Sequence, residues 1–292
     1  MTRGTGPALY AVEISDLHVG RKASHVRRLP DMLEPLLSER QVPLNVFILG
    51  DFLDRSDDLI RMDGSVKEKA LRGLPKGQLN MLEFLAAAHT ERRASITVVE
   101  GNHDRTREHR LLHVRPHPLF PYPVREYIHF TLGGQGWLGV HGHFLDPEWL
   151  HKRWLSEGAN DAYRLLQKWD SEDAQFARWA EKRVTGGRRR TLKKLLPVAA
   201  VRYAHAVRLT EARLRDLHPP VRVNHIICGH SHEAVEDRRI HPARPYDDVG
   251  PDDPAAIHYH NAGNWVDRPK DGGCGWLAIR HDGSVKLHHH DW

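Results

Sequence analysis

The chain has 292 residues, of which 40% are hydrophobic and 28% charged, and this balance excludes an extensively disordered protein. The net charge of +5 is uneven, because residues 147–218 alone hold 16 Lys and Arg against 9 Asp and Glu. No stretch approaches the roughly 18 unbroken apolar residues of a membrane span, and two cysteines without a CxxC spacing exclude a thiolate metal site.

Three β-branched, apolar runs in the first third of the chain predict buried strands at Leu9–Ile14, Leu44–Leu49 and Ile96–Val99. Amphipathic stretches between them predict helices at Arg28–Glu39 and Gln78–Glu91. The alternation of strand and helix predicts βαβ units and therefore an α/β fold. In such a sheet, ligands collect beyond the carboxyl ends of the strands.

A fourth strand is predicted at Trp137–Val140, and about 70 residues of helical character follow it. We interpret residues 147–218 as a helical cap inserted into a single domain that spans residues 1–292. The loop at His241–Pro254 is predicted from its four prolines and four aspartates. The strands predicted after the insert are Val223–Cys228, Ile257–His260, Trp276–Arg280 and Val285–His288.

Metal-binding residue types recur directly after five of these strands. Asp16 and His18 stand two apart, so their side chains project to the same side. The Asp51 carboxylate can bridge two cations, and Asn102 offers a neutral carbonyl oxygen. Any one such pair is more often an ordinary turn, but five at strand ends indicate a shared site. The five segments are Ser15–His18, Gly50–Arg55, Gly101–Asp104, Val140–His143 and Gly229–His232.

The ordered set DxH, GDxxDR, GNHD, H and GHxH resembles the calcineurin-like metallophosphoesterases, from Ala8 to about Trp265. The resemblance implies a four-layer α/β/β/α sandwich with a helical cap and two divalent metal ions. Carboxylate, amide and imidazole ligands suit manganese best here, with iron or zinc as alternatives. The implied ligands are Asp16, His18, Asp51 and His232 for the first ion, and Asp51, Asn102, His141 and His230 for the second.

The resemblance also implies a mechanism, in which two cations roughly 3.5 to 4 Å apart activate a shared water for attack on phosphorus. His103 matches a histidine that is not a ligand and that either donates a proton to the leaving oxygen or stabilises the transition state. Asp104 either holds the His103 ring or caps its loop. Arg55 is expected to contact phosphate, and Asp54 to support a histidine. His143 either faces the substrate or is an ordinary buried polar residue.

Within the family, the closest resemblance is to the UDP-2,3-diacylglucosamine pyrophosphohydrolase-like group, which also carries a helical insertion. The segment Asn261–Trp265 matches a late Asn-x-Gly-x-Trp segment of that group, and it either walls the pocket or packs in the core. The fourth motif departs from the group's HGD, since this chain has His141, Gly142 and His143. A nucleotide-linked, UDP-sugar lipid-like substrate is therefore an expectation of the resemblance alone.

The predicted partner is a small phosphoester or nucleotide-containing substrate in the cytoplasm, since the polar start of the chain lacks a signal-peptide core. The basic run Lys182–Lys194 is either a solvated face or a contact for anionic lipid or nucleic acid. The alternatives within the fold are a nuclease and a phosphoprotein phosphatase. The alternative outside it is a nucleic-acid or membrane-surface binding module with a vestigial metal site.

Overall fold

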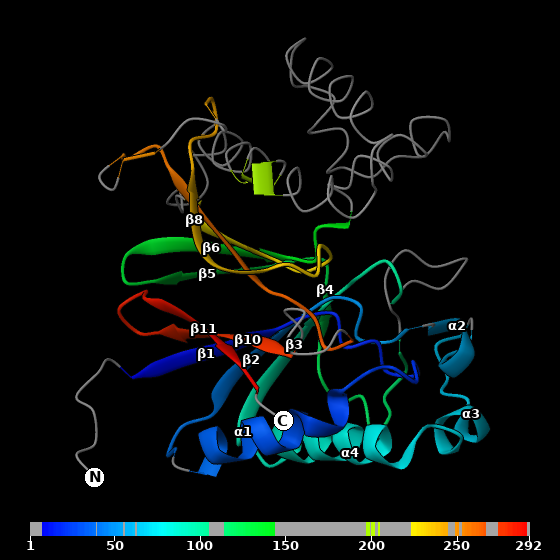
Figure 1. Ribbon diagram of the computed structural model, residues 1–292. Helices are drawn as coiled ribbons and strands as arrows, with labels where there is room; N and C mark the ends of the chain where they lie inside the picture. Colours follow the sequence, from blue (N-terminus) through cyan, green and yellow to red (C-terminus); the bar gives the residue numbers. More distant parts are fainter. Residues whose placement is uncertain are drawn as a thin grey trace, which may run out of the picture.

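The protein contains two stacked sheets with helices on the outer face of the first (Figure 1). The structure is a computed structural model. None of the helices in the described part of the chain is long and apolar enough to cross a membrane. The described residues are 8–38, 40–54, 56–61, 63–104, 114–143, 197–198, 200–201, 204, 223–244, 249–250, 253–266 and 274–290.

The first sheet has six strands in the order β11-β10-β1-β2-β3-β4. β1, β2, β3 and β4 run parallel, and β10 joins β1 antiparallel. The carboxyl ends of the parallel strands therefore meet at one edge of the sheet. The strands are β1 (Leu9–Ile14), β2 (Leu44–Leu49), β3 (Ala94–Val99), β4 (Val124–Arg125), β10 (Gly275–Arg280) and β11 (Val285–His289).

The second sheet has five strands in the order β5-β6-β7-β9-β8. Its inner strands β6, β7 and β9 are parallel, whereas β5 and β8 are antiparallel edge strands. The strands are β5 (Ile128–Leu132), β6 (Gln135–Val140), β7 (Val223–Cys228), β8 (Ala234–Ile240) and β9 (Ile257–Ala262).

The helices α1 (Leu29–Ser38) and α4 (Lys76–Thr90) cover the outer face of the first sheet (Figure 1). The buried residues of α1 recur at helical spacing, and they pack in one core with the β1, β2 and β3 side chains. Three short helices complete this layer and the loops beside it: η1 (Val26–Arg28), α2 (Ser56–Leu59) and α3 (Glu68–Arg72).

The two sheets bury a second core between them, to which Phe47 and Leu49 contribute from one side and Trp137 and Ile227 from the other. On the far face of the second sheet, the helical residues 200, 201 and 204 pack against β7 and β9. Helix, sheet, sheet and helix thus follow one another, and the predicted α/β fold is confirmed. The predicted cap at 147–218 lies outside the described residues, apart from residues 197–198, 200–201 and 204.

All eight predicted strands are present, with ends shifted by up to two residues. The strands β4, β5 and β8 were not predicted, and β8 illustrates the reason. Its sequence AVEDRRI is mostly polar, because an edge strand faces solvent and only Ile240 is buried. The described residues of the expected loop at 241–254 belong to no helix and no named strand.

A row of stacked rings crosses the second sheet between the layers. Trp137 stacks on His225 at 3.8 Å between ring centroids, and His225 stacks on His258 at 4.6 Å. His225 also meets His260, with 3.0 Å between Nδ1 and Nε2. Burial lowers the pKa of His225 to about 2, with the charges of His260 and His258 acting in the same direction. Burial likewise lowers the pKa of His260 to about 4.

These neutral histidines predict acid sensitivity. In the unfolded chain each binds a proton near pH 6.5, whereas in the folded protein neither does so until about pH 4 or below. Stability is therefore lost as the pH falls below about 6.5, and each histidine costs about 2 kcal/mol at pH 5. Urea unfolding at pH 7.5 and pH 5 measures the difference. His225→Gln should reduce this pH dependence by about 2 kcal/mol, and an unchanged dependence would contradict the assignment.

Candidate metal centre

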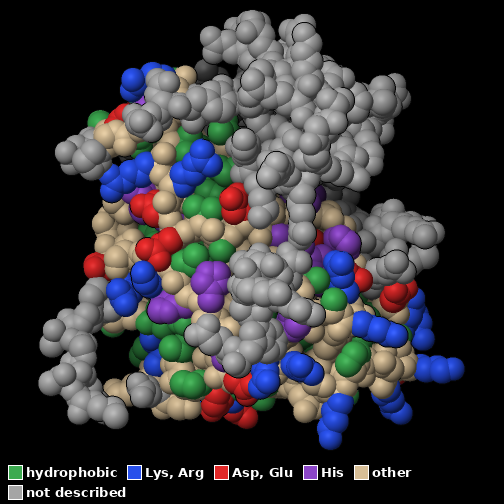
Figure 2. All heavy atoms as spheres, in the orientation of Figure 1, with side chains coloured by type: hydrophobic (Ala, Val, Ile, Leu, Met, Phe, Trp, Pro, Cys, Tyr) green, Lys and Arg blue, Asp and Glu red, His purple; other side chains and the backbone are tan. Residues whose placement is uncertain are grey.

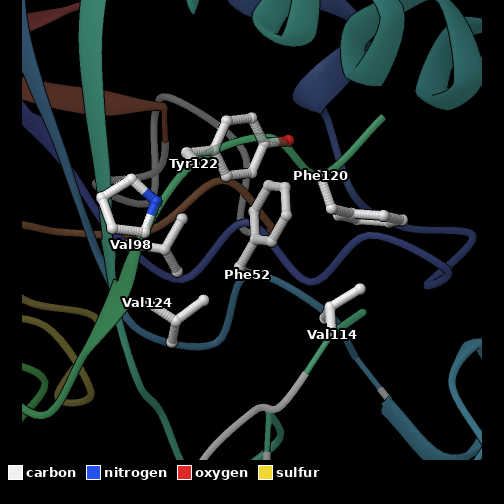
Figure 3. Close-up of a pocket in the computed structure, with 7 residues that line it drawn as sticks. Phe52, Val98, Val114, Phe120, Tyr122 and Val124 are labelled. Carbon is white, nitrogen blue, oxygen red and sulfur yellow. The ribbon is translucent and has the colours of Figure 1, made fainter. Parts of the chain in front are cut away.

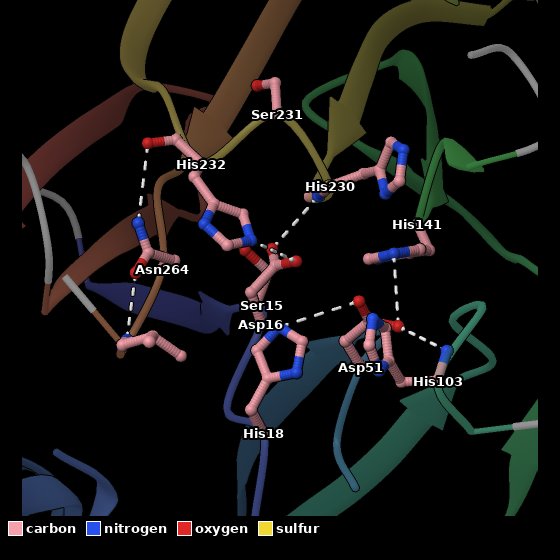
Figure 4. Close-up of polar contacts among 12 residues, drawn as sticks. Ser15, Asp16, His18, Asp51, His103, His141, His230, Ser231, His232 and Asn264 are labelled. Atoms are coloured by element: carbon pink, nitrogen blue, oxygen red, sulfur yellow. Dashed lines mark hydrogen bonds and ion pairs between the residues drawn. The ribbon is translucent and has the colours of Figure 1, made fainter. Parts of the chain in front are cut away.

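The loops after β1, β2, β3, β6 and β7 converge, and their polar side chains point toward one another (Figure 4). Five residues of these loops have positive φ, a conformation that costs energy outside glycine: Asp16, His18, Asp51, His230 and His232. Backbone strain of this kind clusters at functional sites, where the surrounding structure holds it in place. The folding of the five loops thus forces these side chains into one volume.

The first cluster consists of Asp16, His18 and His232, whose ligand atoms lie within 4.8 Å of one another. His232 Nε2 and Asp16 Oδ1 lie 3.4 Å apart. Asp16 Oδ1 and His18 Nε2 are both buried, and neither has a hydrogen-bond partner among the described residues. A buried carboxylate oxygen and a buried imidazole nitrogen without hydrogen bonds fit the coordination of a cation.

The second cluster consists of Asp51, His141 and His230. His141 Nδ1 lies 2.9 Å from the carbonyl oxygen of Leu49 and donates its proton there. The lone pair of its Nε2 then faces the cluster, 3.4 Å from Asp51 Oδ1 and 3.2 Å from Asn102 Oδ1. This backbone contact is the kind that orients a metal-binding imidazole.

Asp51 lies between the two clusters. Its Oδ1 faces His141 at 3.4 Å, and its Oδ2 faces His18 Nε2 at 3.6 Å. The side chain is buried, and Oδ1 also accepts the backbone N–H of His103 at 2.9 Å. One carboxylate therefore presents an oxygen to each cluster.

The electrostatics of the metal-free site favour cation binding. Burial opposes a charged imidazole, but the carboxylates of Asp51 and Asp16 outweigh it and raise the pKa of His141 to about 9. Burial also opposes the charge of Asp51, yet His141 and His18 hold its pKa well below the usual range. The buried carboxylates thus attract positive charge strongly, which divalent cations supply when bound.

Gly101 permits a close approach that a side chain would prevent. A Cβ at this position would lie 2.1 Å from the backbone nitrogen of Asp51 and 2.2 Å from its Oδ1. The loop after β3 can therefore reach the bridging carboxylate only because residue 101 is glycine.

His103 lies beside the first cluster, with its ring 4.8 Å from that of His18 and its side chain 40% exposed. Its Nδ1 contacts the carbonyl oxygen of Asp54 at 2.6 Å. The Asp54 carboxylate also accepts from His18 Nδ1 at 3.1 Å. A single aspartate thus orients two histidines of the site, as expected for Asp54.

Of the two interpretations of Asp104, the structure supports the loop cap and not the contact with the His103 ring. The buried Asp104 carboxylate instead accepts three backbone N–H groups, those of Gly101, Phe52 and Leu53. Burial and the nearby charge of Asp51 raise the pKa of Asp104 to about 6. Asp104 is therefore a positioning residue that joins the loops after β2 and β3.

The remaining predictions for the site have mixed outcomes. Arg55 and the basic run Lys182–Lys194 lie outside the described residues. His143 is buried, with its ring 5.5 Å from that of His141, but it belongs to neither ligand cluster. Asn261 and Trp265 are fully buried: Asn261 donates to the carbonyl of Gly229, and Trp265 packs in the core under the helices. The segment Asn261–Trp265 therefore packs in the core and stabilises the loop after β7.

Glu13, which lies in β1 and is fully buried, was not among the predicted site residues. Neither of its carboxylate oxygens has a hydrogen-bond partner among the described residues. Burial raises the pKa of Glu13 well above its usual range, and the charge of Asp16 acts in the same direction. A lone acidic residue in an otherwise apolar strand was the signal that identifies such a group.

An apolar pocket of about 250 Å³ is lined by Phe52, Val98, Val114, Phe120, Tyr122, Pro123 and Val124 (Figure 3). Its lining contains none of the candidate metal ligands, and Phe52, Phe120 and Tyr122 belong to the core under the helices. The polar site is therefore separate from this pocket.

The donor set fits divalent cations, since it contains carboxylate oxygens, an amide oxygen and imidazole nitrogens, and both cysteines are free and buried elsewhere. A family model described as calcineurin-like phosphoesterase matches residues 11–234. The chain belongs to the calcineurin-like phosphoesterase family. Members of this family are metal-dependent hydrolases of phosphoesters, and the His and Asp clusters are the candidate ligands here.

Two further comparisons add little to this family assignment. The chain is similar to a solved structure described as a protein of unknown function, AQ665 from Aquifex aeolicus, at 16% identity and a TM-score of 0.30, over 75% of this chain and 77% of that one. A superposition at this TM-score supports no inference. None of the curated proteins compared matches the chain.

Proposed function

We propose that this calcineurin-like phosphoesterase hydrolyses a phosphodiester or pyrophosphate bond at a centre of two divalent metal ions, with manganese the first candidate. The observation that carries the proposal is the position of Asp51, which presents one oxygen to each of two imidazole clusters. Two such ions would supply Lewis-acid stabilisation of the phosphoryl oxygens and an activated water.

Each side chain has a defined part in this proposal. Asp16, His18 and His232 hold the first ion, Asn102, His141 and His230 hold the second, and Asp51 serves both. Because His103 Nδ1 is engaged by the Asp54 carbonyl, its Nε2 is the nitrogen that can hold a proton for the leaving oxygen. Asp54 fixes the rings of His18 and His103 in place.

Hydrolysis of bis(p-nitrophenyl) phosphate, with and without added manganese, tests the proposal. We expect turnover that depends on the metal and disappears with a chelator, together with about two metal ions per chain by elemental analysis. A purified, metal-loaded protein without such turnover would show that the site is vestigial. If turnover is found, a panel of UDP-sugar lipids, cyclic nucleotides, single-stranded DNA and phosphopeptides would define the leaving group.

His103→Ala should lower kcat by about 10² to 10³-fold, because the proton donor to the leaving group is lost. The metal content should stay within experimental error of wild type, since no assigned ligand is removed. The fall in kcat should be smaller for a substrate whose leaving group is p-nitrophenolate than for one whose leaving group is an alkyl alcohol, because p-nitrophenolate departs without a proton.

A loss of metal from His103→Ala would contradict this assignment. The geometry makes that outcome a real alternative, since His103, His18 and Asp51 also place ligand atoms within 4.8 Å of one another. His103→Asn, which keeps a polar group at the position, separates loss of the proton from loss of packing.

A further inference from the structure

A group of exposed cations lies beside the metal centre on the side of α3 and α4. Residues 19–29 and 69–79 together hold seven Lys and Arg and no Asp or Glu. Figure 2 shows Lys and Arg side chains gathered over α3 and the start of α4. We define the basic patch as the exposed residues Arg21, Lys22, Arg27, Arg72 and Lys76.

Hydrogen bonds join the two segments of the basic patch into one surface. Gln78, in the first turn of α4, accepts the backbone N–H of Gly20 and donates to the carbonyl of Arg21, both at 2.8 Å. Arg27 packs against the same turn, since a Cβ on Gly77 would lie 2.8 Å from Arg27 Cβ. Lys76 begins α4 and Arg72 ends α3, four residues earlier.

The basic patch is attached directly to a candidate metal ligand. The backbone N–H of Arg21 donates to the carbonyl oxygen of His18 at 3.0 Å, so the patch begins within one turn of the first cluster. Among the residues that the structure describes, no carboxylate forms an ion pair with any of the five patch cations. Their charge therefore remains available to an anionic partner.

The chemistry of the basic patch favours phosphates over other anionic surfaces. The exposed large hydrophobic residues in the described part of the chain are Val42 and Tyr127, and neither lies in the patch. The patch therefore offers no apolar anchor for a membrane and no ring on which a base would stack. What it offers is contact with the phosphate backbone, which is independent of base sequence.

We propose that the basic patch binds the phosphates next to the scissile one in a single-stranded nucleic acid. The proposal rests on the proposed function, and it names a polynucleotide as the substrate. Asp16 and Asp51 are buried whereas the five patch residues are exposed, so the scissile phosphate would approach the metal centre while its neighbours lie on the patch, a path that a flexible strand can follow. Water gives its hydroxyl to phosphorus and its proton to the departing sugar oxygen, so one P–O bond forms and one breaks.

Two variants of equal charge test the proposal. Arg21→Gln with Lys76→Gln removes two patch cations, whereas Arg92→Gln with Arg238→Gln removes two exposed cations elsewhere, one of them beyond the other end of α4. Binding of a fluorescein-labelled 20-nucleotide single-stranded DNA is measured by anisotropy in the His103→Ala background, in 50 to 200 mM salt. Cleavage of the same DNA and of bis(p-nitrophenyl) phosphate is measured with the manganese-loaded enzyme.

We expect the patch variant to bind the DNA about tenfold more weakly. The slope of log affinity against log salt concentration should become shallower by about 1.4. Its kcat/KM should fall by about tenfold for DNA and stay within twofold for bis(p-nitrophenyl) phosphate. The control variant should stay within twofold for both. Equal weakening in both variants, no DNA binding, or patch-dependent binding to phosphatidylserine vesicles in preference to DNA would overturn the proposal.

The two proposals fail in different ways. If bis(p-nitrophenyl) phosphate is hydrolysed but DNA is neither bound through the patch nor cleaved, the phosphoesterase stands and the polynucleotide substrate is wrong. If nothing is hydrolysed, the proposed function is wrong, and the polynucleotide substrate that depends on it is wrong as well.

Discussion

Asp51→Asn is expected to lower kcat/KM for bis(p-nitrophenyl) phosphate by about 10³-fold or more, the largest effect of any single side-chain change at the site. The substitution keeps the size of the side chain but removes the buried negative charge that faces both His18 and His141. Elemental analysis should show less metal bound, since both clusters lose the same carboxylate.

Asp63→Asn is the matched control, because it makes the same chemical change in an exposed loop where the Asp63 carboxylate accepts from Ser65. Its kcat/KM and metal content should equal those of wild type. If Asp51→Asn kept full metal content and full activity, a bridging role for Asp51 would be wrong.

Gly50→Ala is expected to destabilise the protein by about 3 to 5 kcal/mol and to lower kcat/KM by at least about 10²-fold. Gly50 has a φ of +78°, and a Cβ there would lie 2.3 Å from the ring of His141. The alanine therefore costs backbone strain and also displaces a candidate ligand from its contact with the Leu49 carbonyl.

Gly134→Ala separates these two effects. Gly134 has nearly the same φ, +76°, but its Cβ would meet nothing within 4 Å. This control should cost only the backbone strain, about 1 to 2 kcal/mol, and leave kcat/KM unchanged. Urea unfolding and bis(p-nitrophenyl) phosphate kinetics on the two variants give both comparisons. Equal losses of stability and activity would contradict the contact with His141.

The sequence was most informative where burial is complete. The strands β1, β2, β3, β6 and β7 are buried along most of their length, so their apolar runs identified them, and the ligand types followed at their ends. Edge strands such as β8 carry polar side chains toward solvent, and their sequences do not differ from those of loops. The edge strands β4, β5 and β8 were therefore missed, whereas the edge strand β11 was predicted.

Within the site, local sequence did not predict which neighbour each side chain would contact. Asp104 stands next to His103, and this adjacency made a contact with the ring one of two interpretations, beside a loop cap. In the folded chain Asp104 turns to the backbone of Phe52 and Leu53, and Asp54, 49 residues earlier, takes the contact with His103. Hydrogen bonds of this kind depend on how two loops pack, because adjacent residues need not point the same way.

The sequence by itself determined the ligand types, their order along the chain and the α/β alternation, because each of these is a local pattern of residues. Only the tertiary structure decided that Asp51 lies between two clusters, that Asp54 supports two histidines, and that Arg21 and Lys76 share one surface. Those arrangements join segments tens of residues apart, and burial and hydrogen bonding of the folded loops fix their distances. The residue types at the five strand ends indicated the metal-dependent chemistry, and the packing of the loops determined how those residues are arranged.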